Sequence, residues 1–141
     1  MKKIARLSFF YSILGMLLGV FYREFTKINN YTEETVLSGL HTHILVLGLF
    51  FFLIVLLLEK SFGLTRHKHF SKFLVTYNIG LMLSVIMMAI RGCVEVLDLK
   101  ISSVMDSSIT GIAGLSHIIM TIAYILFFLI LLNRLNDVDN K

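Results

Sequence analysis

Residues 39–48, GLHTHILVLG, begin an apolar run that continues as far as Leu58. This run is long enough to cross a bilayer as a helix, because a span needs about 20 residues. Two histidines, His41 and His43, stand at its start. A histidine at the edge of a membrane helix costs free energy and therefore marks a candidate functional site. Each helical residue turns by about 100°, so positions i and i+2 point to nearly opposite sides. We therefore expect the two histidines to belong to two different sites, one on each flank.

The composition indicates an integral membrane protein. The chain has 141 residues, of which 57% are hydrophobic, and its mean hydropathy is +0.84, more apolar than a soluble domain of this size requires. No β-barrel alternation is present. The sequence predicts an all-α fold, a bundle or arc of four transmembrane helices in a single domain covering residues 1–141. Apolar runs of spanning length, about 20 residues each, lie at roughly 4–22, 40–58, 70–94 and 108–132.

The charge distribution predicts that both termini are cytoplasmic, because cytoplasmic segments carry an excess of Lys and Arg. Nine of these residues fall at the two ends of the chain or around the second loop: Lys2, Lys3, Arg6, Lys60, Arg66, Lys68, Lys72, Arg134 and Lys141. The opposite side holds Arg23, Lys27, Arg91 and Lys100. This asymmetry explains the net charge of +4 without a nucleic-acid partner. We expect a multi-pass protein of a bacterial cytoplasmic membrane.

Four ionisable side chains are expected at one depth near the outer face. His41 and His43 open the second span, Arg91 lies near the end of the third, and His117 lies about two turns into the fourth. Such a layer suits a b-type haem, whose iron takes two axial imidazoles and whose propionates pair with a guanidinium. Cys93 is the only cysteine, so a c-type attachment site is excluded. Side chains of a suitable type for the walls of a haem pocket are Phe50, Phe51, Tyr77, Met82 and Tyr124.

Each of these residues also has a structural explanation. A membrane histidine such as His117 can simply hydrogen-bond a neighbouring helix. Arg91 can extend to the surface, or it can pair with Glu95 one helical turn later. His67 and His69 lie in the basic second loop, where we expect them to be solvated.

The stretch from His41 to Gly48, HTHILVLG, resembles the His-x-His helix of the main subunit of haem-copper oxidases and nitric oxide reductases. In that family, one histidine of the pair goes to the low-spin haem and the other to the active-site haem. The resemblance implies a unit similar to one of the family's three four-helix arcs, with Arg91 in the place of its propionate-binding arginines. No paired histidines for copper and no tyrosine–histidine crosslink follow, so oxygen reduction by this chain alone is not expected. The whole chain also resembles a family of small four-span bacterial membrane proteins of unknown function.

Resemblance to a single arc implies a homotrimer in which His41 of one protomer and His43 of the next bind a haem between them. A competing arrangement places one haem inside each protomer, between the second span and His117. Bis-histidine ligation suits electron transfer with an as yet unknown redox partner, redox or gas sensing, or haem handling.

Two other classes of protein remain open. In one, a divalent-metal binding or transport protein uses His41, His43 and His117, with Glu33 or Glu34 as a further ligand. The lack of carboxylates in the middle of the spans argues against a transport path. In the other, the chain is a non-catalytic membrane assembly subunit whose histidines only pack.

Overall fold

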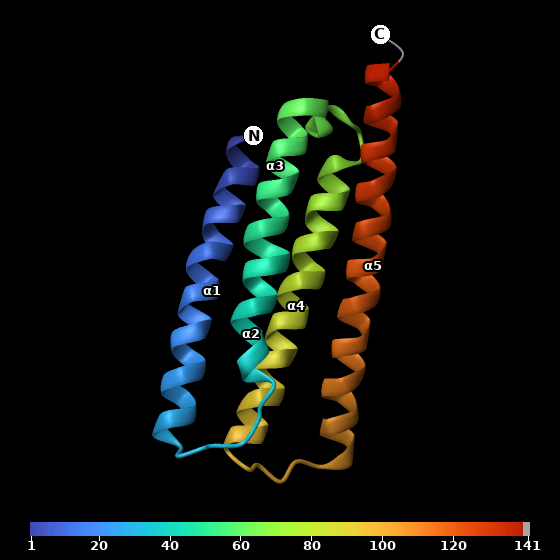
Figure 1. The fold of residues 1–141 in the computed structure, drawn as a ribbon. Helices are drawn as coiled ribbons and strands as arrows, with labels where there is room; N and C mark the ends of the chain where they lie inside the picture. The colour runs from blue at the N-terminus through green and yellow to red at the C-terminus, as the bar shows by residue number, and fades with distance from the viewer. Residues whose placement is uncertain (140–141) are drawn as a thin grey trace.

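The computed structural model describes residues 1–139, and that part of the chain is all-helical (Figure 1). Four helical segments are long and apolar enough to cross a membrane, which confirms the predicted fold class and fits a multi-pass membrane protein. The second segment is interrupted by a π-helical stretch, η1, and a short 3₁₀ turn, η2, follows it. The elements are α1 (Lys2–Ile28), α2 (Leu37–His43), η1 (Ile44–Phe50), α3 (Phe51–Phe62), η2 (Leu64–Arg66), α4 (Phe70–Val96) and α5 (Ser103–Asp139).

The helices extend beyond the ranges predicted from hydropathy. The first was expected at about residues 4–22 but covers Lys2–Ile28, and the last was expected at about 108–132 but covers Ser103–Asp139. Hydropathy marks only the part of a helix that suits hydrocarbon. Polar helical turns that continue past this part, such as the one containing Asp106, give no apolar signal.

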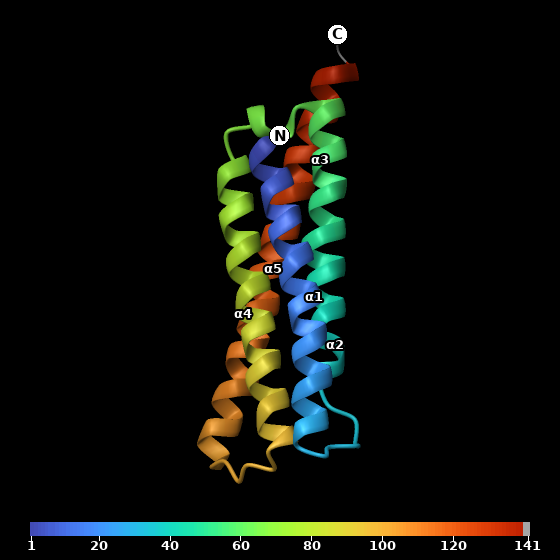
Figure 2. The ribbon, with the colours of Figure 1, turned by 90° about the vertical axis from the view of Figure 1, so that its left-hand side faces the viewer.

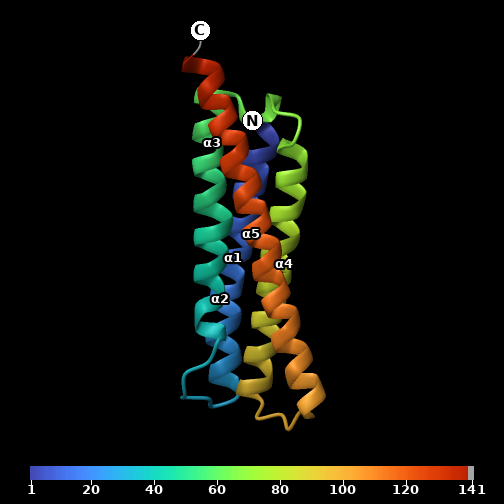
Figure 3. The same cartoon turned by 90° about the vertical axis from the view of Figure 1, so that its right-hand side faces the viewer.

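The four spans run side by side, and the start of α1 and the end of α5 lie at the same end of the bundle, called the terminal end below (Figure 1). The α1 helix packs against α2, η1 and α3, whereas α5 packs along α4 and also touches α3. Seen from one side, α1 is in front of α5 (Figure 2), and from the other side α5 is in front of α1 (Figure 3). The second span and α4 therefore separate the first helix from the last.

Aromatic side chains form the core of the half of the bundle nearer the termini. Phe51 stacks on Tyr77 with ring centroids 4.4 Å apart, and Tyr11 stacks on Phe52 at 5.7 Å. Large apolar side chains are exposed on the outer faces of all four spans, as a surface that faces lipid rather than water requires. The two histidines at the start of the second span lie between this aromatic core and the far end of the bundle. That end, called the loop end below, carries the connections 29–36 and 97–102.

The start of the second span is fixed by a carboxylate from α4. Glu95 accepts hydrogen bonds from Thr35 Oγ1 at 2.8 Å and from the backbone N–H of Val36 at 2.9 Å. The first N–H groups of a helix have no partner within the helix. Glu95 supplies the hydrogen-bond acceptor for the Val36 N–H. It therefore connects the start of α2, the helix that carries both histidines, to the end of α4.

Candidate functional site

His41 and His43 lie on opposite flanks of the second span, as their spacing predicts. His41 faces α1, because a Cβ built on Gly19 would lie 3.7 Å from His41 Cβ and Cγ. His43 instead lines a cavity of 280 Å³ on the side of α4 and α5. The two imidazoles therefore belong to different surroundings within one chain.

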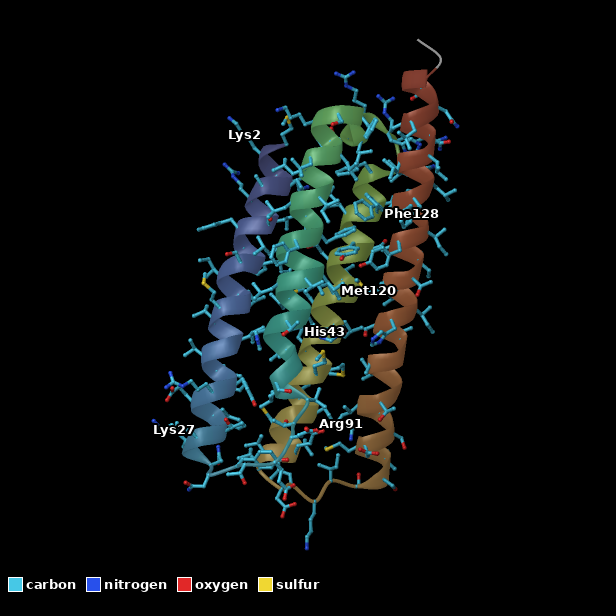
Figure 4. The ribbon with its side chains drawn as sticks, in the orientation of Figure 1. Lys2, Lys27, His43, Arg91, Met120 and Phe128 are labelled. Atoms are coloured by element: carbon cyan, nitrogen blue, oxygen red, sulfur yellow. The ribbon has the colours of Figure 1, made fainter. Side chains whose placement is uncertain are left out.

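The cavity on the His43 side also contains His117. Its lining comes from the second span, α4 and α5, namely His43, Leu47, Leu81, Ser84, His117, Met120, Thr121 and Tyr124. Figure 4 shows His43 and Met120 in the space between the second span and α5, with Arg91 nearer the loop end. Since α5 packs along α4 and α3 without comparable packing against α2 or η1 in the described residues, this side is a groove with an open edge.

The hydrogen bonds of His43 and His117 fix the same tautomer for both rings. His43 Nδ1 lies 3.1 Å from the carbonyl oxygen of Gly39, and His117 Nδ1 lies 2.8 Å from that of Ala113. A carbonyl oxygen only accepts, so each Nδ1 carries the proton and each neutral ring keeps its lone pair on Nε2. Neither Nε2 has a hydrogen-bond partner among the described residues. Metal-ligating histidines have this arrangement, in which the second ring nitrogen donates to a carbonyl or carboxylate.

His41 has a different environment. Its Nδ1 is buried without a hydrogen-bond partner among the residues described, and its Nε2 lies 3.4 Å from Thr42 Oγ1. A buried polar atom without a partner typically costs about 1–3 kcal/mol. The structure thus brings His43 and His117 to one cavity and leaves His41 outside it.

Arg91 pairs with α5 rather than with its own helix. Its Nη1 lies 2.6 Å from Asp106 Oδ1, and its Nη2 donates to Thr110 Oγ1 at 2.7 Å. The possible pair with Glu95 does not form, because the Glu95 carboxylate is bound to the start of α2. Arg91 also lines a cavity of 170 Å³ with Met88 and Ala113. Ala113, which lines this cavity, also supplies the carbonyl that positions His117 in the histidine cavity.

Only Tyr124, of the five residues expected to form the walls of a haem pocket, lines the histidine cavity. Phe50 is 55% exposed on the outer surface, whereas Phe51, Tyr77 and Met82 belong to the core or pack against it. The five residues were expected from their chemical type alone, which does not fix where a side chain points. Along the second span, the wider i→i+5 turns of η1 also change side-chain directions from the α-helical pattern.

The π-helical stretch and the hydroxyl groups around it were not expected from the sequence. Tyr77 donates a hydrogen bond to the Leu47 carbonyl at 2.7 Å, and its hydroxyl lies 3.3 Å from that of Tyr124. Ser8 donates to the Leu49 carbonyl at 3.0 Å. Such π-helical turns frequently occur at functional sites. The polar residues Ser8 and Tyr77 in apolar spans were the available signal, since each needs a partner in the membrane.

The described residues contain no group of three or more His, Cys, Asp or Glu side chains able to hold a metal ion. Glu33 and Glu34 line a separate cavity of 760 Å³ at the loop end, together with Glu95 and no histidine. His67 and His69 lie at the other end of the bundle, where His67 Nε2 is 3.4 Å from Asn133 Nδ2. His41, His43 and His117 therefore do not form such a group in the described residues.

These features define a four-span, all-helical protein with a histidine-lined groove between its second and fourth spans. The model of the family described as "Protein of unknown function (DUF2871)" matches residues 1–134, so the chain belongs to this family. No curated protein and no solved structure matches the chain.

Proposed function

We propose that this protein binds b-type haem in the groove, with His43 and His117 as the axial ligands. The observation that supports the proposal most directly is that both imidazoles line one cavity in the tautomer that leaves Nε2 free. Two neutral imidazoles are the usual ligand set of low-spin haem iron, and each ring here is already oriented by a backbone carbonyl.

The other groups of the groove suit the same ligand. Leu47, Leu81 and Met120 supply an apolar wall, and Arg91 supplies a charged donor for carboxylates in the adjoining cavity. Ligand pockets usually measure roughly 300–1,000 Å³. The histidine cavity measures 280 Å³, so a porphyrin would also need the open edge of the groove. The two histidines and Arg91 therefore suit haem, and the open edge of the groove would provide the additional space that the porphyrin needs.

When bound, haem would supply reversible one-electron chemistry at its iron. The protein's own groups would bind and orient it: His43 and His117 would hold the iron, and Arg91 would neutralise propionate charge. With two histidines as ligands, both axial positions would be filled, which suits electron transfer, redox sensing or haem handling; gas sensing would require one histidine to leave the iron. A redox partner would have to approach from the exposed parts of the chain.

We further propose that the protein acts as a homotrimer, with both termini cytoplasmic, in a bacterial cytoplasmic membrane. The imidazole of His117 is exposed in the single chain, and a Cβ on Gly111 or Gly114 would meet no atom within 4 Å. A neighbouring copy could therefore cover the open edge of the groove. In the second ligand arrangement that a trimer permits, His41 of one protomer and His43 of the next would bind the haem.

The test is an optical spectrum of the protein purified in mild detergent after expression with added haem precursor. Under the proposal, the preparation shows a sharp Soret band, and resolved α and β bands appear after dithionite reduction. A preparation that stays colourless after haem titration would contradict haem binding. Elemental analysis of that colourless protein would then test the divalent-metal alternative, and metal-free protein would favour the assembly subunit.

Alanine variants identify the ligands. Within one protomer, His43→Ala and His117→Ala each abolish the low-spin spectrum, whereas His41→Ala keeps it. If the haem lies between protomers, His41→Ala and His43→Ala abolish the spectrum and His117→Ala keeps it. The oligomeric mass in mild detergent with haem retained tests the trimer separately, and a monomer or dimer would contradict it.

A further inference from the structure

The end of α3 lies at the terminal end of the bundle (Figure 1), and a separate cavity is found there. This cavity measures 340 Å³ and lies far along the helices from Arg91. Its lining includes Glu59, Lys60, Ser61, Gly63, Arg66 and Arg134. It is independent of the histidine groove and of the haem proposal.

Two guanidinium groups from different elements meet over Gly63. This residue ends α3 with φ at 62°, a left-handed conformation that glycine adopts without strain. A Cβ built on it would lie 3.5 Å from Arg66 Nε and 3.6 Å from Arg134 Nη2. Because two like charges repel, their proximity favours an anion that both can reach, and guanidinium groups bind phosphate through paired donors.

The nearby carboxylates leave this positive charge only partly neutralised. Glu59 accepts hydrogen bonds from Thr65 N at 2.7 Å and from Thr65 Oγ1 at 2.6 Å. Asp137 pairs with Nη1 of Arg134, which leaves Nη2 of that guanidinium facing Gly63. The Arg66 guanidinium has no ion pair among the described residues. The cavity is therefore electropositive.

An apolar surface leads along α3 to this cavity. Ile54 and Leu57 are exposed, and Leu57 is 66% exposed. Residues three and four apart share one face of a helix, so Leu57 lies on the same face as Lys60 and Ser61, which line the cavity. A charged hollow at the end of a membrane span, continued by an apolar face, has the shape of a headgroup site with a path for acyl chains.

We propose that this cavity binds the phosphate of an anionic phospholipid. Arg66 and Arg134 donate to the phosphate oxygens, Lys60 adds a third positive charge, and the acyl chains lie along Ile54 and Leu57. A free inorganic phosphate can accept the same hydrogen bonds from Arg66 and Arg134, but it has no acyl chains to contact Ile54 and Leu57.

Native mass spectrometry of the full chain in detergent tests this site. The probes are dioleoylphosphatidylglycerol, dioleoylphosphatidylcholine and inorganic phosphate alone. We expect one phosphatidylglycerol to be retained per chain in preference to phosphatidylcholine. The Arg66→Gln variant should weaken phosphatidylglycerol binding by about fivefold, the effect of one basic residue near a membrane surface. Arg66 is chosen because Arg134 also donates to the Phe62 carbonyl, so its loss could disturb the fold.

The matched control is Lys68→Gln, which removes one charge at the same end of the bundle outside the cavity. This variant should bind phosphatidylglycerol as the unaltered chain does. Equal weakening by both variants would overturn the site, because it would show only general attraction to positive charge. Retention of phosphatidylcholine as strong as that of phosphatidylglycerol, or binding of inorganic phosphate that removes the lipid, would also overturn it.

Discussion

The ring of Tyr11 on α1 lies directly against Gly48 in the π-helical stretch of the second span. A Cβ built on Gly48 would lie 2.6 Å from Tyr11 Cγ and 2.7 Å from Tyr11 Cβ. The same tyrosine stacks on Phe52 and donates a hydrogen bond to Asn78 Oδ1 on α4. Three of the four spans therefore meet at Tyr11, and they do so because Gly48 has no side chain.

The first prediction concerns this contact. Gly48→Ala should lower the free energy of unfolding by about 1–3 kcal/mol, because an added methyl group forces α1 away from η1. Thermal unfolding in detergent, followed by circular dichroism, measures the change. Gly19→Ala is the control, since a Cβ there would lie 3.7 Å from His41 Cβ and Cγ, an ordinary contact distance. There the substitution should be neutral or stabilise by up to about 1 kcal/mol. Equal effects of the two variants would contradict the packing argument.

The second prediction concerns the hydroxyl of Tyr77. Tyr77→Phe should lower the free energy of unfolding by about 0.5–1.5 kcal/mol, because it removes the hydrogen bond from Tyr77 to the Leu47 carbonyl of η1. The same unfolding measurement applies. Tyr22→Phe is a matched control, because no hydrogen bond of the Tyr22 hydroxyl occurs in the described part of the chain. If Tyr22→Phe costs as much as Tyr77→Phe, the hydrogen bond to η1 is not what stabilises this region.

The third prediction concerns the start of α2. Glu95→Gln should speed backbone amide exchange at residues 36–40, because the charged acceptor for Thr35 and for the Val36 N–H is weakened. Hydrogen exchange with mass spectrometry measures it. Glu34→Gln removes a neighbouring exposed carboxylate that no side-chain hydrogen bond uses in the described residues. Unchanged exchange in Glu95→Gln would show that α2 begins without this cap.

The sequence predicted the four spans and the opposite directions of His41 and His43, because both follow from local rules of length and rotation. It left open whether the second span and His117 share a site, as the arrangement with one haem in each protomer assumes, since that depends on how α5 packs along α4. It named Phe50 for the walls of a haem pocket from its type alone, and it offered a haem propionate or Glu95 as the partner of Arg91. The outward position of Phe50 depends on the wider turns of η1, which change which residues face inward. The pairing of Arg91 with Asp106 forms only because α4 and α5 lie together.

The last prediction separates a binding role of Arg91 from a structural one. Arg91 is 30% exposed and Asp106 is 51% exposed, so their ion pair should contribute at most about 1 kcal/mol to stability. If Arg91 neutralises haem propionate, Arg91→Met should weaken haem affinity by about tenfold, the value of one charged hydrogen bond. Asp106→Asn should leave affinity unchanged or raise it, because it removes a competing carboxylate. Haem titration and thermal unfolding of both variants measure the two effects separately. Equal losses of affinity in both variants would mean that Arg91 acts only by joining α4 to α5.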